Sequence, residues 1–141
     1  MDHRIETHSL GARDLTGSPT TRRAAVGAGL LDGGGDGGGS GSVPDDGVTV
    51  DVAELHAPFA PQELILRDAL GLSDAVAINP SGGALAANGV MLAGLVRIGE
   101  AATRIMDGTA QTALAHATSG PCLQQNLVCA LAAEAAGDGR G

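Results

Sequence analysis

Aromatic side chains are almost missing from this chain of 141 residues, which has one Phe, Phe59, and no Trp or Tyr. Its apolar fraction of 43% therefore comes almost entirely from Ala, Val, Leu and Ile, which suits a closely packed core of small side chains. Lysine is also missing, and the formal net charge is −8. Nucleic acids and anionic membranes attract clustered positive charge, so we expect neither as a partner.

Two further absences narrow the class of protein. The chain has no apolar run of membrane-spanning length and no signal segment at its start, which predicts a cytoplasmic protein. Its two cysteines, Cys122 and Cys129, are too few for a disulfide framework and lack the spacing of a structural zinc site, so no metal is expected. Cys129 lies in an apolar run and is predicted to pack as a small hydrophobe. Cys122 follows a Gly-Pro pair and is either an inert turn residue or a partly exposed thiol.

The sequence predicts three helices. Ser18 followed by Pro19 is typical of a helix start and predicts a helix to about residue 28. Pro61 and Gly71 bound a second, shorter helix. The third is predicted over about 85–106, because apolar residues recur there every three or four positions. Its predicted buried face comprises Met91, Leu95, Ile98, Ala102 and Ile105, and its predicted solvated face comprises Arg97, Glu100, Arg104 and Asp107.

Strand signals fill the intervals between these helices. Residues 48–52 alternate valine with Thr and Asp, which predicts a strand that buries one face and ends near His56. Residues 75–78 predict a brief strand, and residues 112–117 and 126–132 predict two strands joined by a Gly-Pro turn. This order predicts an α/β fold in which a mixed, mainly parallel sheet carries helices on its faces.

A glycine-rich run at residues 33–42 interrupts this pattern. Such a run buries too little apolar surface to offset its ordering entropy, so we interpret it as a flexible insertion. A calcium-binding glycine repeat would need more carboxylates than this single copy supplies. The predicted organisation is one domain over residues 1–135 with this insertion, followed by a frayed tail at 136–141.

Candidate functional residues follow the predicted strands. Catalytic groups in parallel sheets gather on loops at the carboxyl ends of strands, and His56, residues 79–83 and residues 119–125 all lie at such ends. The glycine pair Gly82 and Gly83 allows positive φ angles and a close approach of the backbone to a ligand, at the entrance to a helix with free N–H groups.

Two histidines fall within or beside the predicted strands. His56 is either a general base or oxyanion donor, or a structural hydrogen-bonding residue. His116 is predicted in the middle of a strand, where a packed neutral imidazole is expected.

Three segments together resemble the C-terminal half of a thiolase, and the likeness covers residues 2–131 apart from the insertion. Residues 52–59, VAELHAPF, are similar to a loop of the lipid-transfer or sterol carrier protein type of thiolase, an acetyl-CoA acetyltransferase-like family, with His56 in the polar position. Residues 79–83, NPSGG, look like the Asn-x-x-Gly-Gly motif of the same type. Cys122 lies in the segment similar to the loop that carries Cys-x-Gly.

The resemblance implies one half of a thiolase-like fold and carbon–carbon bond formation or cleavage on acyl-CoA thioesters in lipid or sterol side-chain metabolism. Coenzyme A would enter as part of the substrate, with no separate cofactor. His56 would hold the thioester oxygen and Cys122 would move a proton. The implied substrate-binding residues are Asn79, Gly82, Gly83 and Asn88.

Two departures from the family bear on activity. Asn88 and Gly89 stand where a Gly-His-Pro motif belongs, so the histidine that activates the nucleophile is replaced by a residue without a side chain. The nucleophilic cysteine belongs to the N-terminal half of the family. We therefore expect an isolated chain to be inactive and its partner to be acyl-CoA together with a thiolase N-terminal half or a homo-oligomer. A non-catalytic acyl-CoA or lipid-binding module, an assembly module, and a retro-aldol lyase component remain alternatives.

Overall fold

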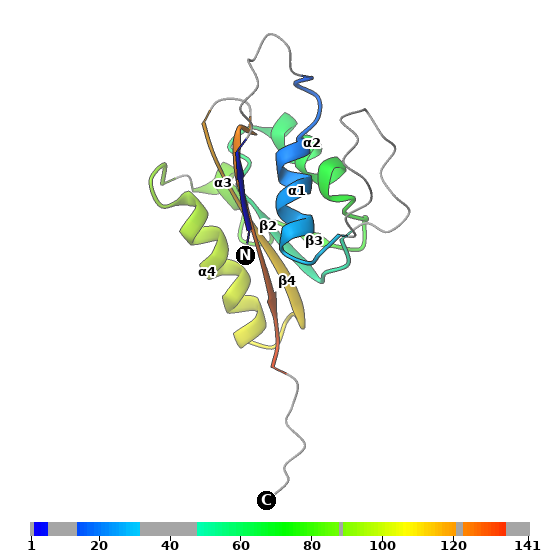
Figure 1. Cartoon of the computed structure of the whole chain (residues 1–141). Helices are drawn as coiled ribbons and strands as arrows, with labels where there is room; N and C mark the ends of the chain where they lie inside the picture. The colour runs from blue at the N-terminus through cyan, green and yellow to red at the C-terminus, as the bar shows by residue number, and fades with distance from the viewer. Residues whose placement is uncertain (1, 6–13, 32–47, 88, 121–122, 135–141) are drawn as a thin grey trace, which may run out of the picture.

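The sheet has five strands of mixed direction in the order β1-β5-β4-β2-β3. In the computed structural model, β2, β3 and β4 run parallel, while β5 pairs antiparallel with both β1 and β4. The predicted α/β class with a mixed sheet is confirmed. The strands span Asp2–Ile5 (β1), Val52–Leu55 (β2), Ala77–Ile78 (β3), Thr112–Ser119 (β4) and Gln125–Ala132 (β5), and the structure describes residues 2–5, 14–31, 48–87, 89–120 and 123–134 (Figure 1).

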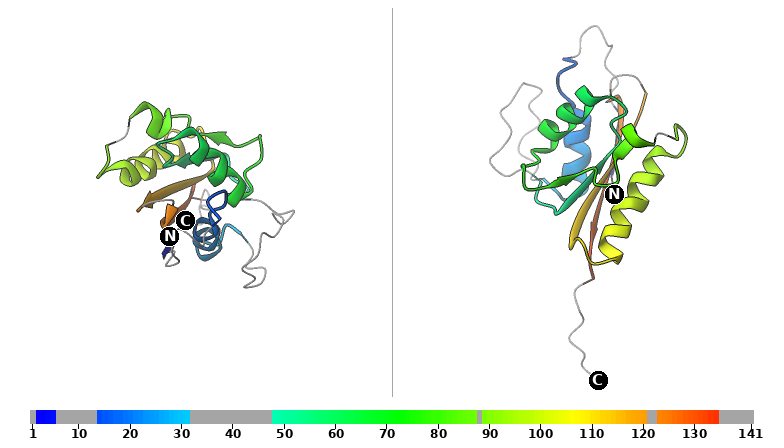
Figure 2. Two further views of the ribbon diagram at one scale, coloured as in Figure 1. Left: turned by 90° about the horizontal axis from the view of Figure 1, so that it is seen from above. Right: turned by 180° about the vertical axis from the view of Figure 1, so that it is seen from behind.

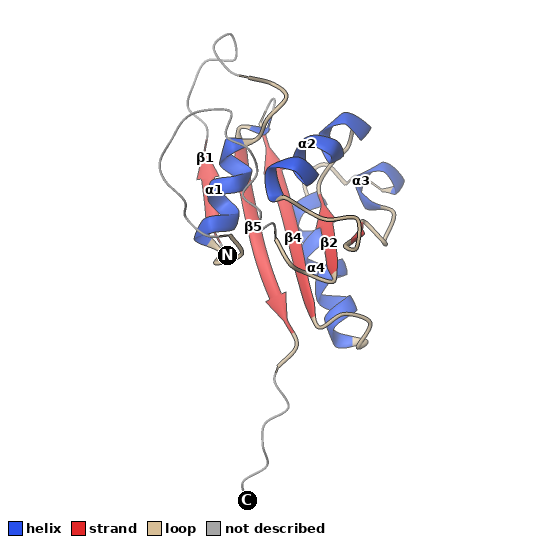
Figure 3. Ribbon diagram, turned by 90° about the vertical axis from the view of Figure 1, so that its right-hand side faces the viewer, coloured by secondary structure: helices blue, strands red, loops and turns tan. Residues whose placement is uncertain are grey.

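Helices cover both faces of the sheet. α1 (Pro19–Gly27) and α2 (Ala60–Leu70) lie on one face, and α4 (Ala93–Met106) lies on the other, as the views in Figures 2 and 3 show. A short α3 (Gly83–Ala86) precedes α4. The apolar core is therefore divided by the sheet: one cluster includes Ala24, Leu55, Leu66, Leu114 and Val128, and the other includes Val52, Ala101, Ala113, Ala115 and Cys129.

Proline and glycine signals locate the first two helices. α1 begins at Pro19, and the Ser18 hydroxyl lies 2.6 Å from the Thr21 hydroxyl instead of capping a backbone N–H. α2 ends at Leu70, and Gly71 caps it with a φ of 61°, a left-handed conformation that glycine adopts without strain. Both predicted helices are confirmed.

The predicted single helix over residues 85–106 is wrong. α3 is a single turn, Ala87 after it is extended with φ −151° and ψ 110°, and α4 begins only at Ala93. A turn closed by a hydrogen bond from the Leu92 N–H to the Gly89 carbonyl, 2.6 Å, leads into α4. Apolar periodicity runs across this break, whereas Asn88-Gly89 is a turn sequence and glycine weakens a helix.

The predicted buried face of α4 is confirmed only in part, because Ile98 and Ile105 are partly buried against the core whereas two other predicted members are not. Ala93, Arg97 and Ala101 are buried against the sheet, whereas Met91 and Leu95 are exposed. Small residues on the inner face let the helix lie close to β4, because a Cβ on Gly94 would come within 2.6 Å of the Ala117 Cβ. Close packing of helix and sheet therefore places small side chains at the centre of the contact, with Ile98 and Ile105 packed partly buried against the same cluster.

The central strand β2 begins later than the strand predicted over residues 48–52. The strand begins at Val52, and Val48 and Val50 are buried in the segment before it. All four residues of β2 are buried, with Val52 packed on the α4 side and Leu55 on the opposite side. A strand flanked by β3 and β4, with helices on both faces, has no solvated face.

Strands β4 and β5 confirm the predicted pair near the end of the chain, and Cys129 is buried in β5 as predicted. None of the helices among the described residues is long and apolar enough to cross a bilayer. The glycine-rich run at 33–42, Asn88, Cys122 and the tail at 136–141 lie outside the described residues.

Candidate functional site

Three predicted loops meet at one end of the sheet, where the parallel strands β2, β3 and β4 have their carboxyl ends. We call this end of the sheet the edge that carries the candidate site. β2, β3 and β4 are parallel, so the segments that follow them emerge on the same side, including His56 after β2 and Asn79 after β3. The Leu55 N–H donates to Asn79 Oδ1 at 2.6 Å, and the Thr118 N–H donates to His56 Nδ1 at 3.4 Å. These two hydrogen bonds join the ends of all three strands, as the sequence predicts.

Asn79 holds the turn with its side chain. Its φ of 48° is left-handed, a conformation that asparagine tolerates better than most residues. Its Oδ1 accepts the hydrogen bond from Leu55, and its Nδ2 donates to Glu63 Oε2 at 3.0 Å. Because both ends of the amide bind protein groups, Asn79 shapes the backbone of the turn.

The glycine pair is required by the turn itself. Gly82 and Gly83 have φ values of 90° and 60°, so the predicted positive φ angles are confirmed. A Cβ on Gly83 would lie 2.9 Å from Asn79 Cγ, and one on Gly82 would lie 2.7 Å from Ala86 Cβ. The Gly82 N–H donates to the Asn79 carbonyl at 2.8 Å and the Gly83 N–H to Ser81 Oγ at 3.2 Å, so both amides are used within the turn.

A buried ion pair lies beneath this turn. Glu54 of β2 is 0% exposed and Arg97 of α4 is 3% exposed, and Arg97 Nη1 lies 2.8 Å from Glu54 Oε2. Ser81 joins them, because its hydroxyl donates to Glu54 Oε2 at 2.7 Å and accepts from Arg97 Nη1 at 2.9 Å. The Ser81 N–H donates to Glu54 Oε1 at 3.1 Å. The cluster fixes the turn to both the central strand and α4.

This cluster overturns the prediction that Arg97 lies on a solvated face. The guanidinium group points into the protein because the Glu54 carboxylate, buried in the central strand, needs a charged partner. Sequence reasoning therefore missed Glu54, Ser81 and Arg97 as the support of the turn.

His56 is partly buried and connects β2 with β4. Its backbone N–H donates to the His116 carbonyl at 3.2 Å, and its Nδ1 accepts from the Thr118 N–H. An imidazole that accepts at Nδ1 is neutral and carries its proton on Nε2. His56 is thus held as a neutral N–H donor at the edge where the loops meet.

His116 confirms the prediction of a packed neutral imidazole. It is fully buried, with Nε2 2.9 Å from Asn126 Oδ1. Asn126 Nδ2 donates in turn to Thr20 Oγ1 and to the Leu123 carbonyl, each at 2.7 Å. Burial lowers the pKa of His116 to about 4, the hydrogen bond to Asn126 opposes this, and a positive charge on the nearby His56, once that ring is protonated, adds to the lowering. This network ties α1 to the hairpin on the face opposite Arg97.

The buried His116 predicts acid sensitivity. Its pKa is about 4 in the folded state against an ordinary value of 6.5, so the unfolded chain binds the extra proton between these pH values. The stability it contributes is fully present above pH 6.5 and is lost as the pH falls towards 4, by about 1.4 kcal/mol for each pH unit.

The substitution His116→Gln keeps an amide donor for Asn126 and removes the titration. Its free energy of unfolding, measured by urea denaturation between pH 7 and about pH 4.5, should fall less steeply than that of the wild type. If the free energy of unfolding falls with pH equally steeply in the two proteins, His116 is not the group that causes the acid sensitivity.

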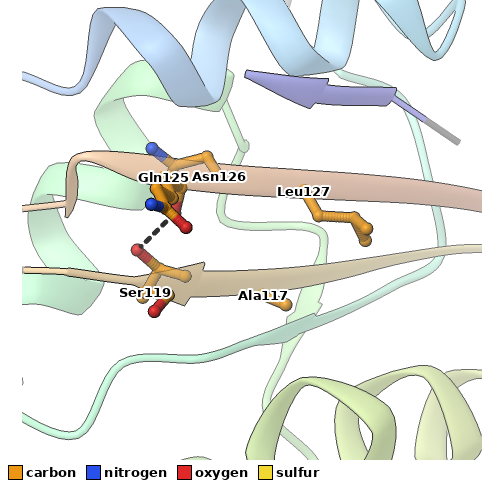
Figure 4. A pocket seen from close by; sticks show the side chains of 6 residues that line it. Ala117, Ser119, Gln125, Asn126 and Leu127 are labelled. Carbon is orange, nitrogen blue, oxygen red and sulfur yellow. Dashed lines mark hydrogen bonds between the residues drawn. The ribbon is translucent and has the colours of Figure 1, made fainter. Parts of the chain in front are cut away.

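A small open hollow lies beside the hairpin of β4 and β5, as Figure 4 shows. The Thr118 hydroxyl donates to the Gln125 carbonyl at 3.0 Å and holds the two strands together there. The hollow is lined by Ala117, Thr118, Ser119, Gln125, Asn126 and Leu127.

Two predicted site residues lie outside the described residues. These are Cys122, predicted in the same hairpin, and Asn88, predicted beside the turn. Among the residues that the structure describes, no group of three or more His, Cys, Asp or Glu is arranged to hold a metal ion.

The fold and this edge define a three-layer α/β protein whose candidate site lies at the carboxyl ends of its parallel strands. No protein-family model, curated protein or solved structure matches the chain. Its function must therefore be inferred from the residues of this edge.

Proposed function

We propose that the chain is the C-terminal half of a thiolase-like acyltransferase, related to the lipid-transfer or sterol carrier protein type, which acts on acyl-CoA thioesters. The main support is the position of His56, residues 79–83 and the hairpin end at Ser119 and Gln125 on one edge. These are the segments whose residues resemble the acyl-CoA loops of that family. Strand topology brings them together independently of that resemblance.

In this proposal His56 is the donor to the thioester oxygen. Carbon–carbon bond formation or cleavage next to a thioester places negative charge on its carbonyl oxygen, and a fixed N–H donor lowers the energy of that state. The hydrogen bond from Thr118 to Nδ1 keeps the proton of His56 on Nε2. Cys122 is the proposed proton carrier at the substrate α-carbon.

The turn at residues 79–83 would shape the acyl pocket through its backbone. The side-chain amide of Asn79 and the backbone N–H groups of Gly82 and Gly83 form hydrogen bonds to other groups of the protein. These hydrogen bonds fix the shape of the turn and leave few of its donors for a ligand. Asn88, further along the chain, is a further proposed substrate contact on the basis of the resemblance alone.

The proposal leaves half of the catalytic machinery to another chain. A covalent acyl-enzyme needs a nucleophilic cysteine and a base, and Gly89 has no side chain at the position of that base. Acyl-CoA and a thiolase N-terminal half or a second copy are the proposed partners.

The glycine at position 89 favours a second candidate function. Without a histidine at Gly89, the domain would serve as a non-catalytic module that binds acyl-CoA or lipid, or as a component of a retro-aldol lyase. Retro-aldol cleavage needs a polarised carbonyl and a base but no acyl-enzyme. Turnover by an assembled protein distinguishes these functions from the acyltransferase.

The purified chain is expected to show no thiolase turnover with acetoacetyl-CoA and free CoA, because nothing at Gly89 can activate a nucleophile. Loss of acetoacetyl-CoA absorbance is the measurement, and a full-length biosynthetic thiolase is the positive control. Robust turnover by the chain alone would refute the assignment as half a site.

A further inference from the structure

Ser81 is the most exposed member of the buried cluster that it forms with Glu54 and Arg97. Glu54 and Arg97 are both buried, whereas Ser81 is partly exposed in the turn that follows β3. This turn lies at the same edge as His56. A molecule bound at the edge can therefore reach Ser81, and the Glu54 carboxylate lies directly behind the Ser81 hydroxyl, with 2.7 Å between Oγ and Oε2.

Most of the turn is held without the Ser81 hydroxyl. The backbone N–H of Ser81 already donates to Glu54 Oε1 at 3.1 Å, and the Gly82 N–H donates to the Asn79 carbonyl at 2.8 Å. Arg97 pairs with Glu54 directly. A buried ion pair is also weak evidence for a purely stabilising role, because apolar residues of similar volume often serve equally well. What the hydroxyl adds is a path between the buried carboxylate and the surface of the turn.

We propose that Ser81 and Glu54 together remove a proton from the α-carbon of an acyl-CoA thioester, so that the chain alone catalyses enolisation of this substrate. The inference rests on the proposed function for the identity of the substrate. It goes beyond that function, because it gives the isolated chain a partial reaction that needs neither a nucleophilic cysteine nor a histidine at Gly89. Ser81 and Glu54 would act in addition to Cys122.

The proton moves in two linked transfers. The α C–H bond breaks and its proton passes to Ser81 Oγ, while the Ser81 proton passes to Glu54 Oε2 along their hydrogen bond. The electron pair of the C–H bond forms an enolate, and the enolate oxygen accepts a hydrogen bond from the Nε2–H group of His56. A proton that returns along the same path regenerates the thioester. Because Ser81 is partly exposed, protons from solvent enter this path, and exchange at the α-carbon is the net result.

Arg97 stabilises the charge that this transfer creates. Its Nη1 donates to Glu54 Oε2 at 2.8 Å and to Ser81 Oγ at 2.9 Å, so its positive charge lies beside the oxygen that meets the substrate. The transfer makes Glu54 neutral and places the negative charge on the enolate, in the field of the same guanidinium group. A hydroxyl oxygen has two lone pairs. The contact from the Gly83 N–H, at 3.2 Å, is the longer of the two that Ser81 Oγ accepts, and it is the one that a substrate would replace.

The test is exchange of the α-protons of butyryl-CoA in D₂O at neutral pD, followed as loss of the α-methylene signal in proton NMR spectra. The wild-type chain alone should exchange these protons well above the rate in buffer. Ser81→Ala should lower the rate by roughly a hundredfold, a typical contribution of a positioned acid–base group. This variant keeps the backbone hydrogen bond to Glu54 and the ion pair, so it should fold normally.

Three further variants separate the hydroxyl and the carboxylate from general effects. Ser81→Thr keeps a hydroxyl and should retain most of the exchange. The double variant Glu54→Gln/Arg97→Met keeps Ser81 without the carboxylate, and it should lose exchange as Ser81→Ala does while its circular dichroism spectrum shows a folded chain. Ser73→Ala is the matched control, because Ser73 is an exposed serine before β3, at the opposite end of the sheet. It should exchange like the wild type.

Binding and exchange together distinguish this inference from the proposed function. If butyryl-CoA shifts the amide signals of residues 79–83 but its α-protons do not exchange, the acyl-CoA site stands and the proton transfer by Ser81 is overturned. Exchange that continues unchanged in Ser81→Ala would also overturn the inference and would leave Cys122 as the proton carrier. Absence of both binding and exchange would overturn the inference and the proposed function together.

Discussion

Replacement of Arg97 by methionine should lower the free energy of unfolding by about 3–5 kcal/mol, the usual cost of leaving one partner of a buried ion pair alone. Glu54 is fully buried, and without Arg97 its charge keeps only the hydrogen bonds from Ser81. Methionine fills a similar volume, so the loss measures the charge more than a cavity. Urea denaturation at pH 7 is the measurement.

Two controls separate this effect from a general loss of arginine. Arg67→Met removes the exposed pair that Arg67 forms with Asp74 at 2.9 Å, and it should cost less than about 1 kcal/mol. The double variant Glu54→Gln/Arg97→Met should be more stable than Arg97→Met alone, because no unpaired charge stays buried. A cost below 1 kcal/mol for Arg97→Met would show that the cluster does not hold the turn.

Replacement of His56 by alanine should lower turnover by roughly a hundredfold or more in an assembly of this chain with a thiolase N-terminal half, the scale of losing one oxyanion donor. The effect should fall mainly on kcat, because charge develops on the thioester oxygen after substrate binds. Steady-state kinetics with purified assemblies give this measurement.

His116→Ala is the comparison for this prediction. His116 is fully buried in its network with Asn126, so its loss should reduce stability and leave the turnover of each folded molecule nearly unchanged. Full turnover by His56→Ala would make the oxyanion role wrong and would favour a module that binds acyl-CoA or lipid without catalysis.

Structural features that depend on one residue and its immediate neighbours could be predicted from the sequence. Pro19 and Gly71 mark helix ends because each restricts or frees its own backbone. The edge that gathers His56 and Asn79 was also predictable, because parallel strands must end on the same side. Gly82 and Gly83 show their positive φ angles for the same local reason.

The supporting cluster was not predictable from such signals. Glu54 and Arg97 are 43 residues apart, and neither alone reveals its partner. The neighbours of each residue in the sequence nevertheless indicate that it is buried. Glu54 interrupts an apolar strand, and Arg97 lies one helical turn from both Ala93 and Ala101. Periodicity also predicted Leu95 on the buried face of α4, whereas the close approach at Gly94 places Ala93 and Ala101 there.

The proposed acyl-CoA site is tested most directly by a titration of the ¹⁵N-labelled chain with acetoacetyl-CoA, followed by amide chemical shifts. The proposal predicts saturable shifts that cluster at His56, residues 79–83 and the hairpin end at Ser119 and Gln125, with much smaller shifts when free CoA is added. Amides on α2, such as that of Leu64, should not move. An absence of shifts up to millimolar ligand, or shifts confined to other surfaces, would contradict the assignment of this edge as an acyl-CoA site.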